Sequence, residues 1–394
     1  MPLPHAIAAE ERLYGPDFVF ATLANFLNSF GSQMLVATLP VYVLALGGSQ
    51  FEAGLVSGAL AFTALLLRPV IGWLTDAWRR RPLVLVGTFC YGLASIVYAM
   101  AGSVPMLVLG RVVHGFGLCN YTTAANAYVA DIAPATRRGE AVGVFAAAQA
   151  FGLITGPTIG FLVIGQMGFA SLFYFSAGLA FAAFAVSLFA RERRRQPWAR
   201  RLPWTPRTGI VSLNALPMAW TSLCLGLGFG PVSAFIAIYA SGRGVENPGL
   251  YFTIQAIALL LSRTFSGHMA DRRGRAVVLV PGVVVLALAL AILPIAHDFA
   301  HFMVSAALYG LGFGMAQPAT MALLIDQVRP EERGMAMSTY FTGFDLGISV
   351  SSLLLGLVSQ TWGFDVMWPI SAAGTLLGLL GLLAGRRPLS QTAH

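Results

Sequence analysis

The stretch Gly72–Arg81, with the sequence GWLTDAWRRR, ends one long apolar run and begins the next. It returns at Gly267–Arg275 as GHMADRRGR, again between two apolar runs. In both copies an aspartate follows a glycine by four residues and arginines follow the aspartate. The two aspartates, Asp76 and Asp271, are 195 residues apart, which is about half of the 394-residue chain.

The same offset recurs along the sequence, which indicates that the whole chain is duplicated. It also links Arg68 to Arg263, Gly115 to Gly310, Asp131 to Asp326, Arg138 to Arg333 and Gly139 to Gly334. A repeat of this length is half a protein, as in transporters built from repeated helix bundles, and is too long for a solenoid repeat.

The composition indicates a membrane protein. Hydrophobic residues make up 57% of the chain and charged residues 10%, whereas soluble domains carry roughly 25% charged residues. All 24 basic residues are arginine, and they lie in short turns between apolar runs, as in multi-pass membrane proteins. Despite the net charge of +8, we therefore expect no nucleic-acid partner.

A membrane-spanning helix needs about 20 mostly apolar residues. The sequence accordingly predicts an all-α membrane protein with twelve transmembrane helices in two pseudo-symmetric six-helix bundles. The expected domains are residues 1–190, a cytoplasmic linker at 191–208 that is rich in arginine, and residues 209–394. The spans are predicted near residues 17–46, 53–75, 82–101, 105–130, 139–164, 168–190, 209–241, 248–270, 276–296, 300–325, 334–361 and 365–385.

The distribution of arginine predicts the orientation. Turns on one side of the membrane hold almost all of the arginines outside the spans, and the other side holds only Arg243. Because turns rich in arginine face the cytoplasm, both termini and the linker are predicted to be cytoplasmic. The expected location is the bacterial inner membrane.

The paired Gly–Asp–Arg turns resemble the signature of the major facilitator superfamily, and the resemblance covers essentially the whole chain. It implies alternating access and a cytoplasmic latch that closes this side in the outward-open state. In the first copy Ala77 replaces a usual basic residue and Arg79 the usual glycine, which leaves the pairing geometry open. The alternative is that these arginines only determine topology. The residues that the resemblance assigns to the latch are Gly72, Asp76, Arg80, Asp131, Gly267, Asp271, Arg275 and Asp326.

Two further stretches resemble family motifs. Arg111, roughly 9 Å below the outer surface, is followed four residues later by a glycine, a pattern that implies proton transfer. His114 lies one turn further on and could also titrate. The alternatives are that Arg111 bonds to carbonyls of a neighbouring helix and that His114 is a packed core residue.

The stretch Gly152–Gly160 resembles the fifth-span motif of antiporters. Small residues permit close helix packing, and a proline removes one backbone donor. The repeat positions in the second half contain no Gly–Pro pair, so this motif favours export. A generic packing seam is the alternative. The motif residues are Gly152, Gly156, Pro157 and Gly160.

Asp345 is expected roughly 16 Å deep, close to the membrane midplane, and its repeat position is Ala150. Burial favours the neutral form of a carboxyl group, which suits a group that binds and releases a proton. A lasting ion pair with Arg263 is the alternative. Arg68 and Arg263 lie at equal depth in the two halves, where they either extend to the cytoplasmic surface or form an anion clamp.

Other polar residues in the predicted spans are candidates for a cavity that binds an organic molecule. The full set of candidate substrate-binding residues is Asn25, Asn28, Gln33, Arg68, Asn120, Tyr121, Gln149, Trp220, Gln255, Arg263, Gln317 and Tyr340.

The leading functional prediction is a secondary transporter that exports a small organic compound, a drug or a metabolite, in exchange for protons. Asp345, Arg111 and His114 would couple it to protons. One alternative is a carrier of an anionic compound, such as an organic acid or a carboxylate-rich metal chelator. Another is a membrane protein that moves or senses lipid without ion coupling. The expected partners are the small-molecule substrate, protons and the lipid bilayer. We expect a monomer that is not an enzyme and that needs no cofactor and no metal.

Overall fold

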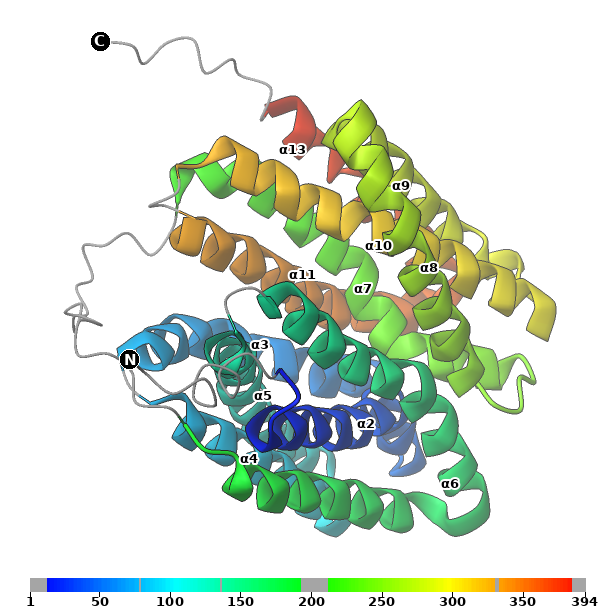
Figure 1. Cartoon of the computed structure of the whole chain (residues 1–394). Helices are drawn as coiled ribbons and strands as arrows, with labels where there is room; N and C mark the ends of the chain where they lie inside the picture. The colour runs from blue at the N-terminus through cyan, green and yellow to red at the C-terminus, as the bar shows by residue number, and fades with distance from the viewer. Residues whose placement is uncertain (1–12, 78, 135–136, 193–211, 330–332, 385–394) are drawn as a thin grey trace, which may run out of the picture. The chain divides into compact units, whose positions relative to one another are not determined.

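The computed structural model describes residues 13–77, 79–134, 137–192, 212–329 and 333–384. These residues are almost entirely helical and contain no strand, as Figure 1 shows. The helices in chain order are α2 (Pro16–Ala45), α3 (Gln50–Ala77), α4 (Arg80–Met100), α5 (Val104–Ile132), α6 (Arg138–Phe189), η2 (Leu213–Ala215), α7 (Leu216–Gly242), α8 (Gly249–Arg273), α9 (Arg275–Ala291), η3 (Leu293–Ile295), α10 (Phe299–Gln327), α11 (Arg333–Trp362), α12 (Phe364–Leu376) and α13 (Leu379–Ala384).

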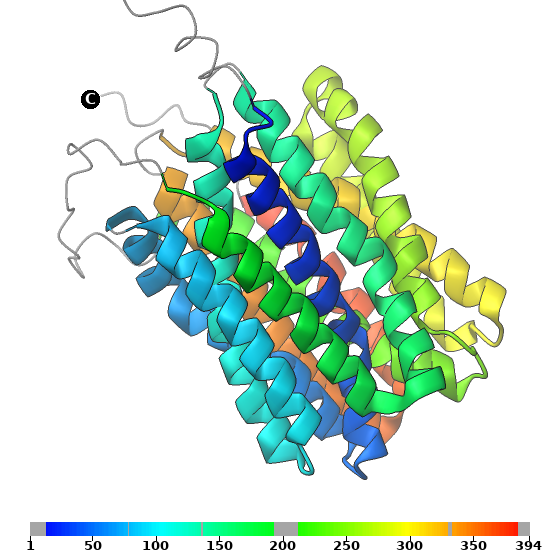
Figure 2. The same cartoon turned by 60° about the horizontal axis from the view of Figure 1, so that its bottom comes forward.

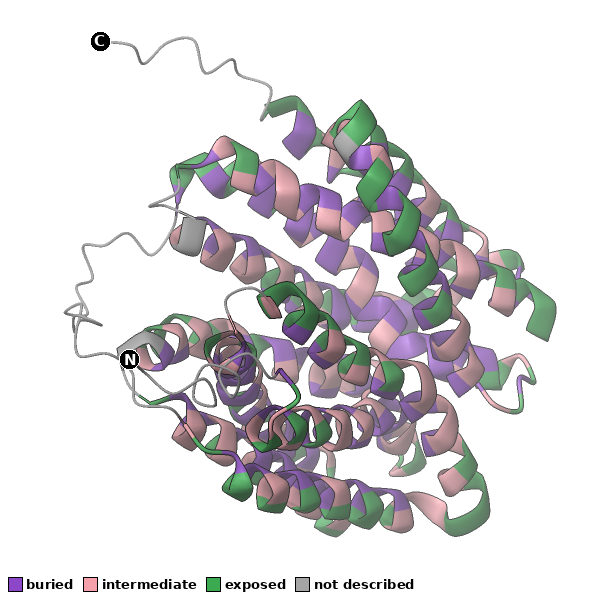
Figure 3. Ribbon diagram, viewed as in Figure 1, coloured by how far each residue is buried: buried purple, intermediate pink, exposed green. Residues whose placement is uncertain are grey.

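Nine helices among the described residues are long and apolar enough to cross a membrane, judged by length and composition. Many of the exposed side chains on the helices are large and apolar, including Phe62, Leu66 and Tyr174. Figure 3 shows exposed and half-buried residues along the helices. A lipid-facing surface explains this pattern, since water would disfavour so much exposed apolar area. The chain is therefore an all-α membrane protein, while the number of twelve spans stays a prediction.

The 52-residue helix α6 covers two of the predicted spans. Gly168, at φ 78° and ψ 174°, interrupts it. Gly363 lies 195 residues later, between α11 and α12, and has φ 84° and ψ 168°. Both positions need the left-handed φ that glycine adopts without strain, so the two halves of the repeat share this turn in backbone geometry as well as in sequence.

The described chain forms two compact units. Of the described residues, the first unit comprises 13–38, 66–77, 79–134 and 137–192, and the second comprises 39–65, 212–329 and 333–384. Residues 39–65, which the sequence assigns to the first bundle, thus belong to the second of these units. The predicted linker, residues 191–208, lies almost wholly outside the described residues, so the predicted domain limits stay a prediction.

In the first unit, α4 packs against α5 and α6, and α2 runs alongside α6 (Figure 2). Glycines make these approaches close. A Cβ atom added at Gly87 on α4 would lie 2.7 Å from the backbone nitrogen of Tyr121 on α5. A hydrophobic cluster that includes Phe18, Tyr121 and Phe145 fills the space between the helices.

In the second unit, α7 packs against α11, and α10 packs against both α8 and α9. The first turns of α3 also belong here, because a Cβ atom at Gly54 would lie in contact with the carbonyl oxygen of Ser352 on α11. Gly226 on α7 and Gly347 on α11 face each other in the same way. Small residues thus let backbones meet directly, as in other membrane helix pairs.

Candidate functional site

The two halves of the repeat each contain an arginine–aspartate pair at the same repeat positions. In the first unit Nη1 of Arg80 lies 2.6 Å from Oδ2 of Asp131. In the second unit Nε of Arg275 lies 3.3 Å from Oδ2 of Asp326. Each pair joins the first residue of one helix, α4 or α9, to the last turns of another, α5 or α10. The sequence predicted these four residues for the latch, and the structure brings them together as two pairs.

The first pair has several additional partners. Arg80 also donates to the backbone carbonyl of Ala127, and its backbone N–H donates to Oε1 of Glu192 at 2.8 Å. The side chain of Arg80 is only 10% exposed, whereas that of Asp131 is 46% exposed. Glu192 also accepts from the backbone N–H of Arg81, so its carboxylate covers the start of α4, where a negative charge is favourable.

The second pair is more open. The side chains of Arg275 and Asp326 are 34% and 54% exposed. Gly274 precedes α9 with φ 93°, whereas Arg79, at the same repeat position, has φ −71° and ψ 141°. The departure that the sequence shows at Arg79 is therefore a real difference in backbone conformation between the two turns.

Other latch residues are placed less fully. The side chains of Asp76 and Asp271 lie outside the described residues. Gly72 and Gly267 make no close helix contact in the part of the chain that the structure describes, because a Cβ atom at either position would meet nothing within 4 Å. Both glycines lie in the last two turns of long helices, α3 and α8.

The fifth-span motif lies on the face of α6 that contacts α2. A Cβ atom at Gly152 would lie 2.8 Å from the backbone nitrogen of Phe30, and one at Gly156 would lie 2.8 Å from Cβ of Gln33. A Cβ atom at Gly160, further along the same face, would lie 3.1 Å from the carbonyl oxygen of Met34. Pro157 is buried beside them. The small residues therefore serve direct packing of two helices that also carry the polar candidates.

Arg111 and His114 lie in one buried cluster of the first unit, and they are 2% and 1% exposed. Nδ1 of His114 lies 3.2 Å from the Tyr98 hydroxyl, and Nε2 lies 3.4 Å from Oγ of Ser32. Tyr98 is also a hydrogen-bond partner of Arg111. Nε and Nη1 of Arg111 have no partner among the described residues.

A polar cavity of about 70 Å³ lies next to this cluster, and α2, α4, α5 and α6 line it. Five predicted residues meet there. They are Asn25, Asn28, Gln33, Tyr121 and Gln149. Asn25 donates to the carbonyl of Phe145 at 2.8 Å and accepts from the Tyr121 hydroxyl at 3.2 Å. Asn25 and Asn28 lie about one turn apart on α2, and both line this cavity.

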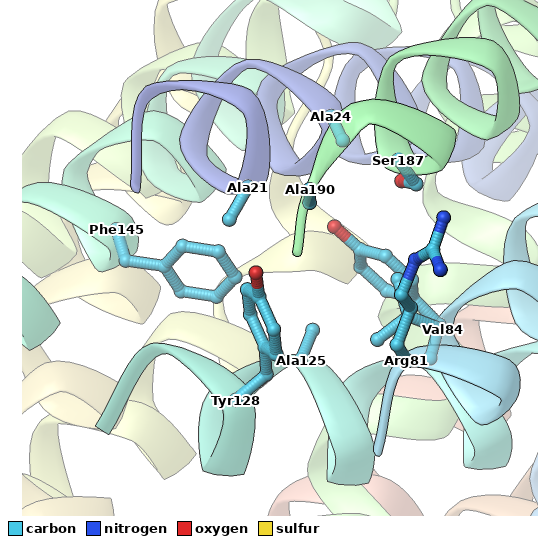
Figure 4. Close-up of a pocket in the computed structure, with 10 residues that line it drawn as sticks. Ala21, Ala24, Arg81, Val84, Ala125, Tyr128, Phe145, Ser187 and Ala190 are labelled. Carbon is cyan, nitrogen blue, oxygen red and sulfur yellow. The ribbon is translucent and has the colours of Figure 1, made fainter. Parts of the chain in front are cut away.

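A second, mostly apolar cavity of about 20 Å³ lies on the other side of Tyr121 and Phe145, which line both. Figure 4 shows Phe145 and Tyr128 on one side of it and Arg81 with Val84 on the other. This volume suffices for about one water molecule and is too small for an organic ligand.

The remaining polar candidates do not gather at this cavity. Asn120 donates to the carbonyl of Phe116 on its own helix, and Trp220 donates to the carbonyl of Leu377. Tyr340 is fully buried in a hydrophobic cluster, and Gln255 is buried on α8.

The charged candidates within the helices have different surroundings. Arg263 on α8 is exposed and donates to Oε1 of Gln317 on α10 at 3.3 Å. Arg68 is half-buried on α3. Asp345 is 5% exposed on α11.

Comparison with known proteins decides the family. The sequence profile of the Major Facilitator Superfamily matches residues 21–249 and 245–393. The chain belongs to the major facilitator superfamily.

Its relatives and structural neighbours are transporters. An uncharacterized MFS-type transporter of Methanocaldococcus jannaschii is 22% identical over 92% of this chain and 96% of its own length. The multidrug resistance protein MdtG of Citrobacter koseri is 24% identical over 92% of this chain and 93% of its own length. Crystal structures of the nucleoside transporter NupG and of a peptide transporter in complex with sulfate share the fold, with TM-scores of 0.77 and 0.76 at 15% identity. The matched regions cover 94% and 96% of this chain, and 100% and 97% of the NupG and peptide-transporter chains, respectively.

Sequence reasoning missed several polar residues of the first unit of this transporter. Ser32, Tyr91 and Tyr98 surround His114, and Glu192 covers the start of α4. Ser32 follows Asn28 by four residues, so the one-turn spacing on α2 could have revealed it. No such local pattern marks Glu192, because its partners are 111 and 112 residues away.

Proposed function

We propose that this MFS transporter exports a small organic compound, a drug or a metabolite, across the inner membrane in exchange for protons. The observation that carries the proposal is the pair of equivalent ion pairs, Arg80–Asp131 and Arg275–Asp326. They connect helix ends at the same repeat positions of the two units. Reversible contacts at repeated helix ends are what an alternating-access carrier needs to favour one state over another.

Two features support export. The chain is similar along nearly its whole length to a multidrug resistance protein. The motif of Gly152, Gly156, Pro157 and Gly160 packs α6 tightly against α2, the helix that carries Asn25 and Asn28. A rigid α2–α6 wall keeps these polar side chains in fixed positions, which favours a defined binding surface in the first unit.

The proposed proton carriers are Asp345 in the second unit, and Arg111 with His114 in the first. Asp345 is a buried carboxyl group on an apolar helix, a place where gain and loss of a proton strongly change local stability. His114 has hydroxyl groups at both ring nitrogens, so a proton can reach either nitrogen along hydrogen bonds. Arg111 lies beside His114 in the same buried cluster, so a positive charge on one of the two side chains favours release of a proton from the other.

A second candidate function is transport of an anionic compound, such as an organic acid. Arg263 lies on α8 in one of the predicted spans, is exposed and donates to the amide oxygen of Gln317. Such a guanidinium binds the oxygens of a carboxylate or a phosphate. Substitution of Arg263 by glutamine should then raise the apparent substrate constant for anions.

The test is substrate-induced proton flux in liposomes that contain the purified protein. A panel of cationic, uncharged and anionic compounds is added, and the parent protein is compared with Asp345→Asn. We expect flux with at least one compound in the parent and its loss in the variant. Equal flux in both would assign the proton to His114 and Arg111. Measurable binding without flux for any compound would contradict proton coupling.

A further inference from the structure

A polar cluster lies around Arg243 on the side of the second unit that is predicted to be outer. Arg243 follows the last residue of α7, and its Nη1 lies 2.6 Å from Nδ1 of His297 and 3.3 Å from the carbonyl oxygen of Ala296. Its Nη2 donates to Oδ1 of Asp365, in the first turn of α12, at 3.1 Å. The hydroxyl of Tyr239 lies 2.8 Å from the same carboxylate oxygen. One guanidinium thus joins the outer ends of α7 and α12 to the connection between η3 and α10.

The repeat shows that the turns themselves do not need this cluster. Gly47 follows α2 and Gly244 follows α7, with φ of 82° and 83°, and each N–H group donates to the carbonyl three residues earlier. The two turns therefore have the same backbone structure. The counterparts of Arg243, His297 and Asp365 in the first half are Leu46, Gly102 and Ala170. Since the first half forms the same turns with these apolar residues, the charged groups are an addition that the second half alone carries.

The contact between Arg243 and His297 fixes the charge of the imidazole. Guanidinium nitrogens only donate hydrogen bonds, so Nδ1 of His297 must accept, and the ring must be neutral with its proton on Nε2. A protonated ring carries N–H at both nitrogens and would place a second donor and a second positive charge against Arg243. The contact can therefore exist only while His297 is neutral. Because His297 is exposed, the outer solution sets its protonation.

Two imidazoles lie at this surface in the described part of the chain, and a proton acts on them in opposite ways. Carboxylates and phenols ordinarily change charge outside pH 5–8, and imidazoles within it. Oδ1 of Asp298 accepts from the backbone N–H of His301 at 3.0 Å and lies 2.6 Å from its Nδ1, and these bonds hold the pKa of Asp298 below its usual value. A proton on His301 therefore strengthens its contact, whereas a proton on His297 breaks one. The other titratable groups of the adjoining segments are Tyr239, Glu246 and Asp365.

We propose that the Arg243–His297 contact is a pH-sensitive clamp at the outer end of the second unit. It holds the connection between η3 and α10 against the end of α7 while the outer solution is neutral, and it opens when His297 gains a proton. The stabilisation is present at neutral pH and is lost as the pH falls. The Arg243–Asp365 ion pair persists, so α12 stays attached while the connection before α10 is released. The inference goes beyond the proposed function and does not depend on it.

Hydrogen exchange of the purified full-length protein in detergent tests the clamp without substrate or proton gradient. Exchange is followed by mass spectrometry in peptides that cover residues 239–246 and 292–302, at about pH 7.5 and about pH 5.5. Division by the intrinsic exchange rate at each pH gives the protection factor. We expect the protection of residues 292–302 to fall about three- to fivefold at the lower pH, the scale of one exposed charged contact. Residues 310–320, in the middle of α10, should keep theirs.

Three variants make the comparison specific. His297→Gln removes the titrating ring but keeps an oxygen that accepts from Arg243, so protection should be the same at both pH values. His301→Gln is the matched control, because it removes the other exposed imidazole and should retain the fall seen in the parent. Arg243→Leu introduces the residue found at position 46 and should lower protection at neutral pH to the acid level of the parent, with no further response.

Three results would overturn the proposal. Protection that is independent of pH in the parent would mean that the contact does not respond to protons. An equal fall in His297→Gln would assign the response to a carboxylate. Loss of the response in His301→Gln would make its contact with Asp298 the sensitive one. Because none of these measurements involves transport, their failure is distinct from a failure of the proposed function.

Discussion

The two ion pairs at the ends of α4 and α9 have the same residues at the same repeat positions but very different surroundings. Arg80 is almost wholly buried, donates to Ala127 as well as to Asp131, and begins a helix that Glu192 covers. Arg275 is one-third exposed and follows a glycine in the left-handed region. Duplication therefore preserved the chemistry of the contact but not its strength, and we expect the second pair to open more readily than the first.

The largest expected difference comes from removing the two acids. Asp131→Asn removes the carboxylate that lies 2.6 Å from the mostly buried Arg80 guanidinium and should lower the free energy of unfolding by about 1.5–3 kcal/mol. Asp326→Asn should cost less than about 1 kcal/mol, because water can hydrate Arg275. Denaturant titration of both variants in the same detergent measures the difference. Equal losses would contradict the inequality of the two pairs.

The turns themselves provide the second comparison. Gly274→Ala forces a side chain into φ 93° and should cost about 1–2 kcal/mol from backbone strain alone, since no atom within 4 Å would clash with the new Cβ. Arg79→Ala, at the same repeat position, has an extended backbone and should change stability little. Thermal unfolding midpoints of the two variants are the readout. If Arg79→Ala were the more damaging change, the backbone explanation would be wrong.

Glu192 is expected to contribute less than either. Glu192→Gln keeps the shape of the side chain but removes the charge that the start of α4 favours, so a loss of about 0.5–1 kcal/mol should follow. Glu140→Gln, which loses its exposed ion pair with Arg137, is the control and should change stability less than Glu192→Gln does. The same unfolding assay distinguishes the two variants. If Glu192→Gln left the free energy of unfolding unchanged, the charge of Glu192 would not stabilise the start of α4 at Arg80.

Salt should produce the smallest effect. Coupling energies from double-mutant cycles on Arg80–Asp131 and Arg275–Asp326 are compared at about 0.05 M and about 1 M salt. Mobile ions screen exposed charges more than buried ones. At the higher salt concentration the Arg275–Asp326 pair should therefore lose most of its coupling energy, a loss of at most a few tenths of a kcal/mol. A larger loss for the first pair would contradict its buried environment.

Much of the fold could be predicted from the sequence. The helix limits depend on apolar runs, and the 195-residue repeat and the four latch residues depend on residue identities at fixed spacings; both kinds of signal are present in the sequence itself. Gly168 and Gly363 lie at the same offset as the other repeated residues, so their shared backbone conformation could also have been anticipated.

The site was less predictable, because it depends on helices that are distant in sequence. Asn25, Asn28 and Gln149 could be chosen by polarity, but so could Asn120 and Trp220, whose side chains bond to backbone carbonyls elsewhere. Which face of a helix meets the cavity depends on how α2, α4, α5 and α6 pack. The same limit hid Tyr98 and Ser32, which look like ordinary core or packing residues until His114 lies between them.

The most direct test of proton-coupled export uses inside-out membrane vesicles that contain the transporter. A compound that elicits proton flux in the liposome panel is added outside, and its accumulation is followed with and without an acid interior. We predict that an acid interior drives accumulation in parent vesicles, and that Asp345→Asn vesicles accumulate none. Accumulation in the absence of any proton gradient, or only when the interior is alkaline, would contradict export in exchange for protons.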